Sequence, residues 1–111
     1  MQVMSEYQKE VVSYFGYWPV FCDAPIKAFR EEGGAIELVL EYIDSNKNIQ
    51  GTVSISFYGV TGNSLSEYEP SSVIDTLKIL EGKQFWVSIE PCYGMGGSFK
   101  CTSVVAKIEN A

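Results

Sequence analysis

The sequence predicts an α+β fold that is mainly antiparallel β. We expect a curved sheet, arranged as a sandwich or half-barrel, with an N-terminal helix packed against it. Apolar residues recur at helical spacing near the N-terminus, whereas from residue 24 to residue 108 they alternate with polar residues between evenly spaced turns. The chain has 111 residues, of which 46% are hydrophobic, enough for one modest core. We therefore expect residues 1–111 to form a single domain.

A helix of about ten residues is expected first. Ser5 and Gln8 have the spacing of a capping box, in which each side chain satisfies a free backbone N–H group at the helix start. An apolar stripe follows at helical spacing, and it consists of Tyr7, Val11, Tyr14 and Phe15. Gly16 should end the helix. Because so short a helix is unstable in water alone, its stripe should dock on the sheet.

The first strands are predicted by alternation of side-chain character. The clearest strand is residues 36–43, where one face would carry Ile36, Leu38, Leu40 and Tyr42. Gly33 and Gly34 can adopt the positive φ angles of a tight hairpin, which should pair residues 25–30 with this strand. A polar turn then leads to a third strand at residues 52–58.

The second half of the chain is less regular. Residues 62–72 are rich in serine and should form a long loop or an irregular edge. The apolar residues of segment 73–80 fit both the helical period and the two-residue period of a strand, and we favour a strand. A short turn should lead to a strand that begins near residue 85, and a glycine-rich turn should precede one last strand at residues 99–108.

The sequence contains no recognisable catalytic or metal-binding constellation. It has no histidine, and its three cysteines, Cys22, Cys92 and Cys101, lack the spacing of a zinc site. A cysteine nucleophile normally needs a neighbouring base, so we expect Cys22 and Cys101 to be packing residues. An odd number of cysteines also argues against a secreted disulfide framework. We therefore expect neither an enzyme nor a cofactor or metal ion.

The N-terminus and the apolar runs indicate the compartment. The first ten residues have neither the basic start nor the apolar centre of a signal peptide. No apolar run approaches the roughly 20 residues that a membrane span needs. We expect a cytoplasmic protein without a membrane partner.

The most unusual segment is GYWPVFCDA at residues 16–24. It resembles the G-x-W-P-x-F-x-D-A signature of the bacterial immunity protein 50 family, in which the matching residues are Gly16, Trp18, Pro19, Phe21 and Asp23. Later in the chain, Tyr93-Gly94 and Phe99-Lys100-Cys101 resemble the family's aromatic-glycine turn and F-x-C motif, so that order and spacing match over residues 14–108. The resemblance implies an immunity protein that binds and neutralises a cognate bacterial toxin.

The chain departs from this family pattern beside Asp23. Many members have histidine where Cys22 stands and an acid where Pro25 stands. If the family segment were an acid–base or metal site, this chain would have lost two of its polar groups. We therefore expect a structural role for the segment, with Asp23 anchoring the turn and Trp18 buried against the sheet.

Charge points to the same kind of partner. The formal net charge is −6, and no basic residue interrupts the acids between Arg30 and Lys47, which are Glu31, Glu32, Glu37, Glu41 and Asp44. Such a patch repels nucleic acid and attracts a basic protein, for instance a nuclease-like toxin. Three aromatic residues would anchor the interface, with Glu37, Glu41 and Asp44 around them: Tyr58, Trp86 and Tyr93.

A second interpretation is a small-molecule binding module without catalysis. In that case the curved sheet would enclose a pocket lined by aromatic side chains, namely Trp18, Phe57, Trp86 and Tyr93. The oligomeric state stays open under both interpretations.

Overall fold

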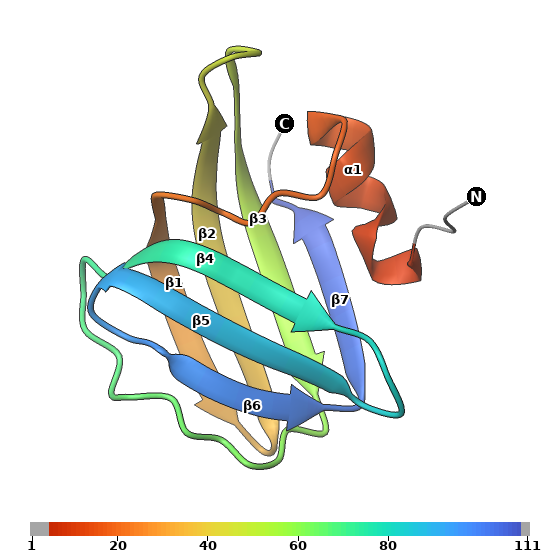
Figure 1. The fold of residues 1–111 in the computed structure, drawn as a ribbon, viewed down its shortest axis with the longest axis vertical. Helices are drawn as coiled ribbons and strands as arrows, with labels where there is room; N and C mark the ends of the chain where they lie inside the picture. The colour runs from red at the N-terminus through yellow and green to blue at the C-terminus, as the bar shows by residue number, and fades with distance from the viewer. Residues whose placement is uncertain (1–4, 110–111) are drawn as a thin grey trace.

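The computed structural model describes residues 5–109 and shows a short N-terminal helix followed by seven antiparallel strands in one sheet that is not closed (Figure 1). This confirms the predicted fold class. In chain order the elements are η1 Glu6–Gln8, α1 Lys9–Phe15, β1 Ala24–Glu32, β2 Ala35–Asp44, β3 Ile49–Tyr58, β4 Val73–Leu80, β5 Phe85–Tyr93, β6 Gly97–Cys101 and β7 Ser103–Ile108.

The sheet folds over into two layers. Its strand order is β6-β5-β4-β1-β2-β3-β7, but β1 and β4 share only two residue pairs, Ala24 with Ile74 and Pro25 with Val73. On either side of this narrow junction the strands diverge, so that β4, β5 and β6 form a front layer that crosses a back layer of β1, β2, β3 and β7 (Figure 1). The inner faces of the two layers enclose the core.

The helix begins and ends as the sequence predicts, except for its cap. Residues 6–15 are helical. Gly16 ends the helix with a φ of 91°, and its backbone N–H donates a hydrogen bond to the Val12 carbonyl. The capping box is wrong, because the Ser5 hydroxyl donates to the Glu81 carboxylate and caps no backbone group. Within residues 5–109 no helix is long and apolar enough to cross a membrane.

The hairpin of β1 and β2 explains how the back layer obtains its register. Gly33 and Gly34 have φ angles of 58° and 77°, as a two-residue turn requires, and they pair Glu32 with Ala35 and Arg30 with Glu37. The next hairpin continues the pattern, since every residue of β2 pairs with one of β3. The alternation read from the sequence therefore becomes one inner apolar face and one outer face.

The predicted last strand is wrong in one respect. Residues 73–80 form the predicted strand, but residues 99–108 are divided between β6 in the front layer and β7 in the back layer. The break is at Thr102, whose backbone N–H and hydroxyl both donate to the Tyr58 carbonyl. The chain therefore turns a corner at this residue and changes layers, and the buried positions shift from Phe99 and Cys101 to Val104 and Ala106. The sequence hides this shift because Val105 is apolar too.

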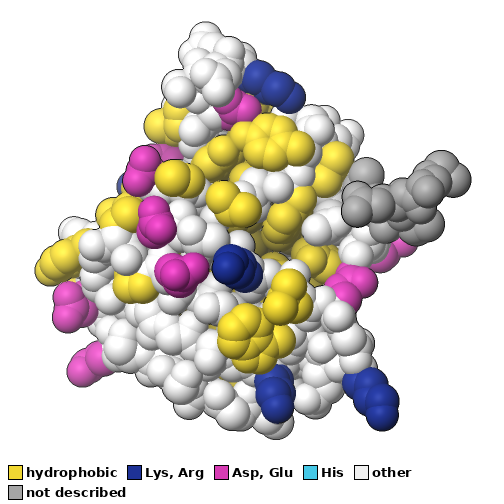
Figure 2. All heavy atoms as spheres, viewed as in Figure 1, with side chains coloured by type: hydrophobic (Ala, Val, Ile, Leu, Met, Phe, Trp, Pro, Cys, Tyr) yellow, Lys and Arg dark blue, Asp and Glu magenta, His cyan; other side chains and the backbone are white. Residues whose placement is uncertain are grey.

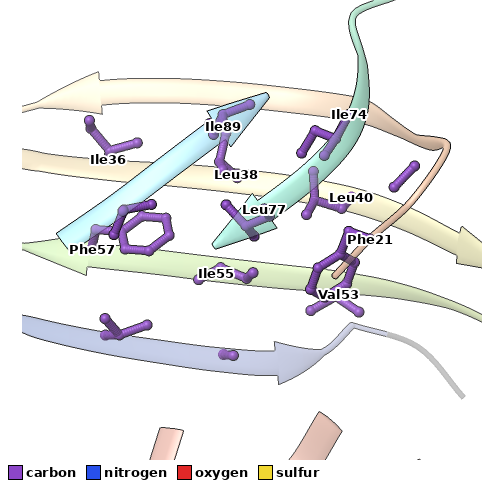
Figure 3. Packing of buried hydrophobic residues seen from close by; sticks show 14 of the residues in the cluster. Phe21, Ile36, Leu38, Leu40, Val53, Ile55, Phe57, Ile74, Leu77 and Ile89 are labelled. Atoms are coloured by element: carbon purple, nitrogen blue, oxygen red, sulfur yellow. The ribbon is translucent and has the colours of Figure 1, made fainter. Parts of the chain in front are cut away.

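One continuous hydrophobic cluster lies between the layers. Figure 3 shows Ile74, Leu77 and Ile89 of the front layer facing Leu38, Leu40 and Ile55 of the back layer, with Phe21 at the edge of the same cluster. Most of these side chains are almost fully buried. The helix adds Val11 and Phe15 on the same side of the back layer, where the Phe15 ring meets Tyr42.

Candidate functional site

The segment of residues 16–24 is a packed junction between helix and sheet. The Trp18 ring stands edge-on to Tyr7 of the helix and to Phe21, with ring centroids 5.2 and 5.6 Å apart. Phe21 is fully buried and Pro19 is buried, while Trp18 is half-buried against the core. Phe21 also holds a φ of 60°, which an L-residue adopts only when its surroundings hold it there. The segment thus joins the helix to the sheet.

Asp23 is exposed, and its carboxylate lies among sulfur and oxygen atoms. The Cys92 Sγ is 3.7 Å from Asp23 Oδ1 and 3.9 Å from Asp75 Oδ1. Among the described residues no backbone N–H bonds to the Asp23 carboxylate, so the expected turn anchor is not seen. Cys22 is exposed, which differs from the packing role expected for it.

These contacts disfavour ionised thiols. The Asp23 charge, followed by loss of hydration and the Asp75 charge, raises the pKa of Cys22 above its ordinary 9.0. Loss of hydration, followed by the same two carboxylates, raises the pKa of Cys92. A nucleophilic or metal-binding cysteine requires the thiolate, which this negative environment opposes. Within the described part of the chain no three Cys, Asp or Glu side chains are arranged to hold a metal ion.

Asp44 belongs to an internal network. Its Oδ2 accepts a hydrogen bond from the Tyr17 hydroxyl at 2.8 Å, and its Oδ1 accepts the N–H groups of Asn46 and Lys47. These bonds, led by the one from Tyr17, lower the pKa of Asp44 below its ordinary 3.8. Because Asp44 is only 8% exposed, the expectation that it lies around an interface is wrong. It stabilises the β2–β3 turn instead.

The same turn also holds the end of the helix. The Lys47 ammonium lies 5.2 Å from the centre of the Tyr17 ring and donates to the Phe15 carbonyl at 3.0 Å. A cation at a helix C-terminus satisfies a free carbonyl and interacts favourably with the negative end of the helix dipole. Thus Tyr17, Asp44 and Lys47 form one structural cluster, and the remaining acidic candidates are Glu37 and Glu41.

Glu37, Glu41 and Tyr58 lie on the outer face of the back layer. Odd-numbered residues of β2 and even-numbered residues of β3 point away from the core, and cross-strand pairing places Ala35 opposite Tyr58 and Glu37 opposite Ser56. Tyr58 is 46% exposed. An open depression of about 290 Å³ lies beside it, lined by Arg30, Glu32, Ala35, Ile36, Glu37, Ser56 and Tyr58. We call this surface the Tyr58 face.

Trp86 and Tyr93 do not join the Tyr58 face. Both are exposed, but they belong to β5 of the front layer and lie seven residues apart, about 23 Å along the strand. Trp86 pairs with Leu80 at one end, and Tyr93 pairs with Val73 at the other. The three aromatic residues expected at one interface centre are therefore on separate surfaces.

The aromatic pocket of the second interpretation does not form. Phe57 is fully buried and packs against Phe99, and the Trp86 side chain lies on the outside of the front layer. A polar hollow of about 460 Å³ does exist where the linker meets the β2–β3 turn, and Tyr17, Asp23 and Asp44 are among the residues that line it. It is open to solvent, and the Asp44 carboxylate in its lining already accepts hydrogen bonds from neighbouring lining residues.

Arg30 is the residue of this face that sequence reasoning missed. Its Nη2 lies 3.6 Å from Glu37 Oε1, so a cation lies beside one of the acids of this face. The two-residue turn at Gly33 and Gly34 could have indicated this, because it sets Arg30 opposite Glu37. No family model matches this chain, nor does any curated protein or solved structure.

Proposed function

We propose that this protein binds another protein stoichiometrically, as an immunity protein that neutralises a cognate bacterial toxin by covering its active site. The contact surface would be the Tyr58 face. The observation that carries the proposal is the half-exposed Tyr58 ring beside Glu37 on a rigid, paired strand. Aromatic side chains surrounded by polar groups are typical of interface centres.

The surroundings of Tyr58 suit a protein partner. Small or aliphatic outward side chains, Ala35, Ser56 and Val105, lie near it, so that a partner can approach the sheet closely. Glu37 and Glu41 lie four residues apart on β2, about 13 Å, and so spread negative charge over the face. A basic toxin surface would be attracted by these acids during encounter and held in register by them.

The binding mode needs no chemistry from this chain. The paired strands hold the backbone of the face in place before the partner arrives, so that little backbone entropy is lost on binding. The junction of residues 16–24 would serve this function indirectly, because it fixes the helix against the inner side of the back layer. We place the protein in the cytoplasm, in agreement with its three unpaired cysteines.

The test uses the product of the gene next to this one, since toxin and immunity genes are commonly adjacent. We expect its effector domain to co-purify with this protein at one-to-one stoichiometry, and its toxicity in cells to disappear on co-expression. Reversing charge with Glu37→Lys and Glu41→Lys should slow association about ten-fold at low salt while the protein stays folded.

The matched control reverses the same charge elsewhere. Glu67 and Glu69 lie on the exposed loop before β4. Glu67→Lys with Glu69→Lys should change the association rate less than about three-fold. Equal slowing by both pairs would show a general charge effect and remove the Tyr58 face from the mechanism. If the neighbouring effector forms no complex with this protein, the proposed immunity function is overturned.

A further inference from the structure

The front layer has an outer face of opposite character to the Tyr58 face. Directly paired residues of antiparallel strands share a face, and pairing gives one row of Leu80, Trp86 and Lys100 and a second row of Lys78, Ser88 and Ser98. We call these six residues the Trp86 face. They contain an aromatic, an aliphatic and two cationic side chains, and no acid.

The two apolar side chains of this face are open to solvent. Leu80 is 56% exposed and Trp86 is 39% exposed, although the inner side of the same strands is closely packed. A cross-strand pair of this size normally stabilises a sheet by burying its surfaces, and here much of that surface stays in contact with water. Figure 2 shows several groups of hydrophobic side chains on this side of the molecule, with both basic and acidic side chains close to them.

The lysines make the Trp86 face an exception in an acidic protein. The chain has a net charge of −6, yet Lys78 and Lys100 lie on either side of Trp86, and Lys83 is in the adjacent turn. Within residues 5–109 none of these three lysines forms a salt bridge. The nearest acids by sequence and register are Glu81, which accepts the Ser5 hydroxyl, and Glu90, beyond the second row.

We propose that the Trp86 face is a second docking surface, whose occupant is an acidic polypeptide segment with apolar side chains. Trp86 and Leu80 would contact the apolar side chains, and Lys78 and Lys100 would pair with carboxylates on either side. Tryptophan is enriched at the energetic centres of interfaces, and charge complementarity sets the register of the partner. The small side chains of Ser88 and Ser98 leave the middle of the sheet open to a partner backbone.

The composition of the face favours this occupant over three others. A nucleic-acid strand needs several stacking rings, whereas this face has one indole. An anionic membrane surface is held by clusters of about four to eight basic residues, whereas this face carries Lys78 and Lys100 alone. A second copy bound by a two-fold axis through this face would set its cationic side chains against an equally cationic surface.

The experiment measures binding of a fluorescein-labelled peptide of alternating aspartate and leucine by anisotropy. We expect Trp86→Ala to weaken binding at least about ten-fold, and Lys78→Gln with Lys100→Gln to weaken it by a similar factor. A peptide with serine in place of leucine should bind at least about ten-fold more weakly than the acidic peptide, and binding of a peptide with lysine in place of aspartate should not depend on Trp86.

The back layer supplies matched controls. Tyr58→Ala removes an exposed aromatic from the other face, and Lys27→Gln with Lys107→Gln removes two exposed cations from the back layer. Both should change the affinity for the peptide less than about two-fold. In wild-type protein, amide signals of β4, β5 and β6 should shift on titration while those of β2 do not, which tests the site without any substitution.

Four outcomes would overturn the proposal. In the peptide experiments, these are an equal loss of affinity in the control variants and amide shifts confined to the back layer. The third is tighter binding of oligothymidylate or phosphatidylserine vesicles that depends on Trp86, and the fourth is self-association in sedimentation that Trp86→Ala abolishes. None of them bears on the Tyr58 face, whose test uses the effector domain and other variants. The two proposals can therefore fail separately.

Discussion

The Tyr17 hydroxyl donates a hydrogen bond to Asp44 Oδ2 at 2.8 Å, and this contact links the linker after the helix to the end of β2. Tyr17 also shares a hydrogen bond of 2.8 Å with the Tyr42 hydroxyl. Burial of the phenol, followed by these hydrogen bonds, raises the pKa of Tyr17, so that its proton stays available to Asp44. The contact explains why the last acid of the acidic stretch stabilises the fold.

We predict that Asp44 makes the stability depend on pH in acid. Because its pKa is lower in the folded protein than its ordinary 3.8, its contribution is complete above 3.8 and is lost as the pH falls through the folded value. Asp44→Asn should therefore lower the urea midpoint near pH 7, and the difference from wild type should shrink as the pH falls below 3.8. A constant difference across this range would contradict the prediction, and Glu67→Gln on the exposed loop is the control.

We predict that Gly16→Ala destabilises the protein by about 1 kcal/mol, because the φ of 91° at the helix end strains any residue with a Cβ. The new Cβ would also lie 2.6 Å from the Lys47 Nζ and displace it from the Phe15 carbonyl. Urea unfolding measures the effect. The control is Gly82→Ala, where φ is not positive and the nearest atom is 3.4 Å away, and a loss as large there would refute the cause given.

We predict that Phe21→Ala lowers the free energy of unfolding by about 3–5 kcal/mol, as removal of a fully buried phenyl ring usually does. The adjacent Val20 side chain is 53% exposed, so Val20→Ala should change stability by less than about 0.5 kcal/mol. Calorimetry of both variants gives the comparison. Similar losses in the two would mean that the junction does not depend on this ring.

We predict that two of the three thiols react in the native protein. Cys22 and Cys92 are exposed, whereas Cys101 is buried and should react with a thiol reagent only after unfolding. Native labelling should be slow near pH 8 and should quicken as the pH rises, because the pKa of both exposed thiols is raised above 9.0.

The effect of Asp23 on Cys22 gives this prediction a specific control. Asp23 is the largest cause of the raised pKa of Cys22, so Asp23→Asn should speed its labelling several-fold, and Asp75→Asn should do so less. Mass spectrometry of labelled peptides separates the cysteines. Faster labelling of Cys22 in Asp75→Asn than in Asp23→Asn would contradict the assigned order of causes.

Much of the fold could be predicted because it depends on local patterns. The helix end at Gly16, the hairpin at Gly33 and Gly34 and the outward position of Glu37 follow from φ preferences and from the two-residue period of a strand. The corner at Thr102 could not be predicted in this way, because its two bonds go to the Tyr58 carbonyl, 44 residues earlier in the chain.

The candidate site was predicted less completely. Glu37 and Tyr58 share a face, as expected of interface residues, but Trp86 and Tyr93 are on the other layer, and Asp44 is buried. A sequence pattern shows that a side chain points away from its own strand's core face. It does not show which of the two layers contains that strand, and so it cannot place two outward side chains on the same surface.

The sequence by itself determined the class of fold, the extent of most elements and the inward or outward direction of their side chains, because these depend on neighbours within a few residues. Only the tertiary structure decided that the acids of the Tyr58 face and the lysines of the Trp86 face lie on opposite layers. The narrow pairing of Ala24 and Pro25 with Ile74 and Val73 lets one sheet fold over on itself, and this long-range contact separates the two faces.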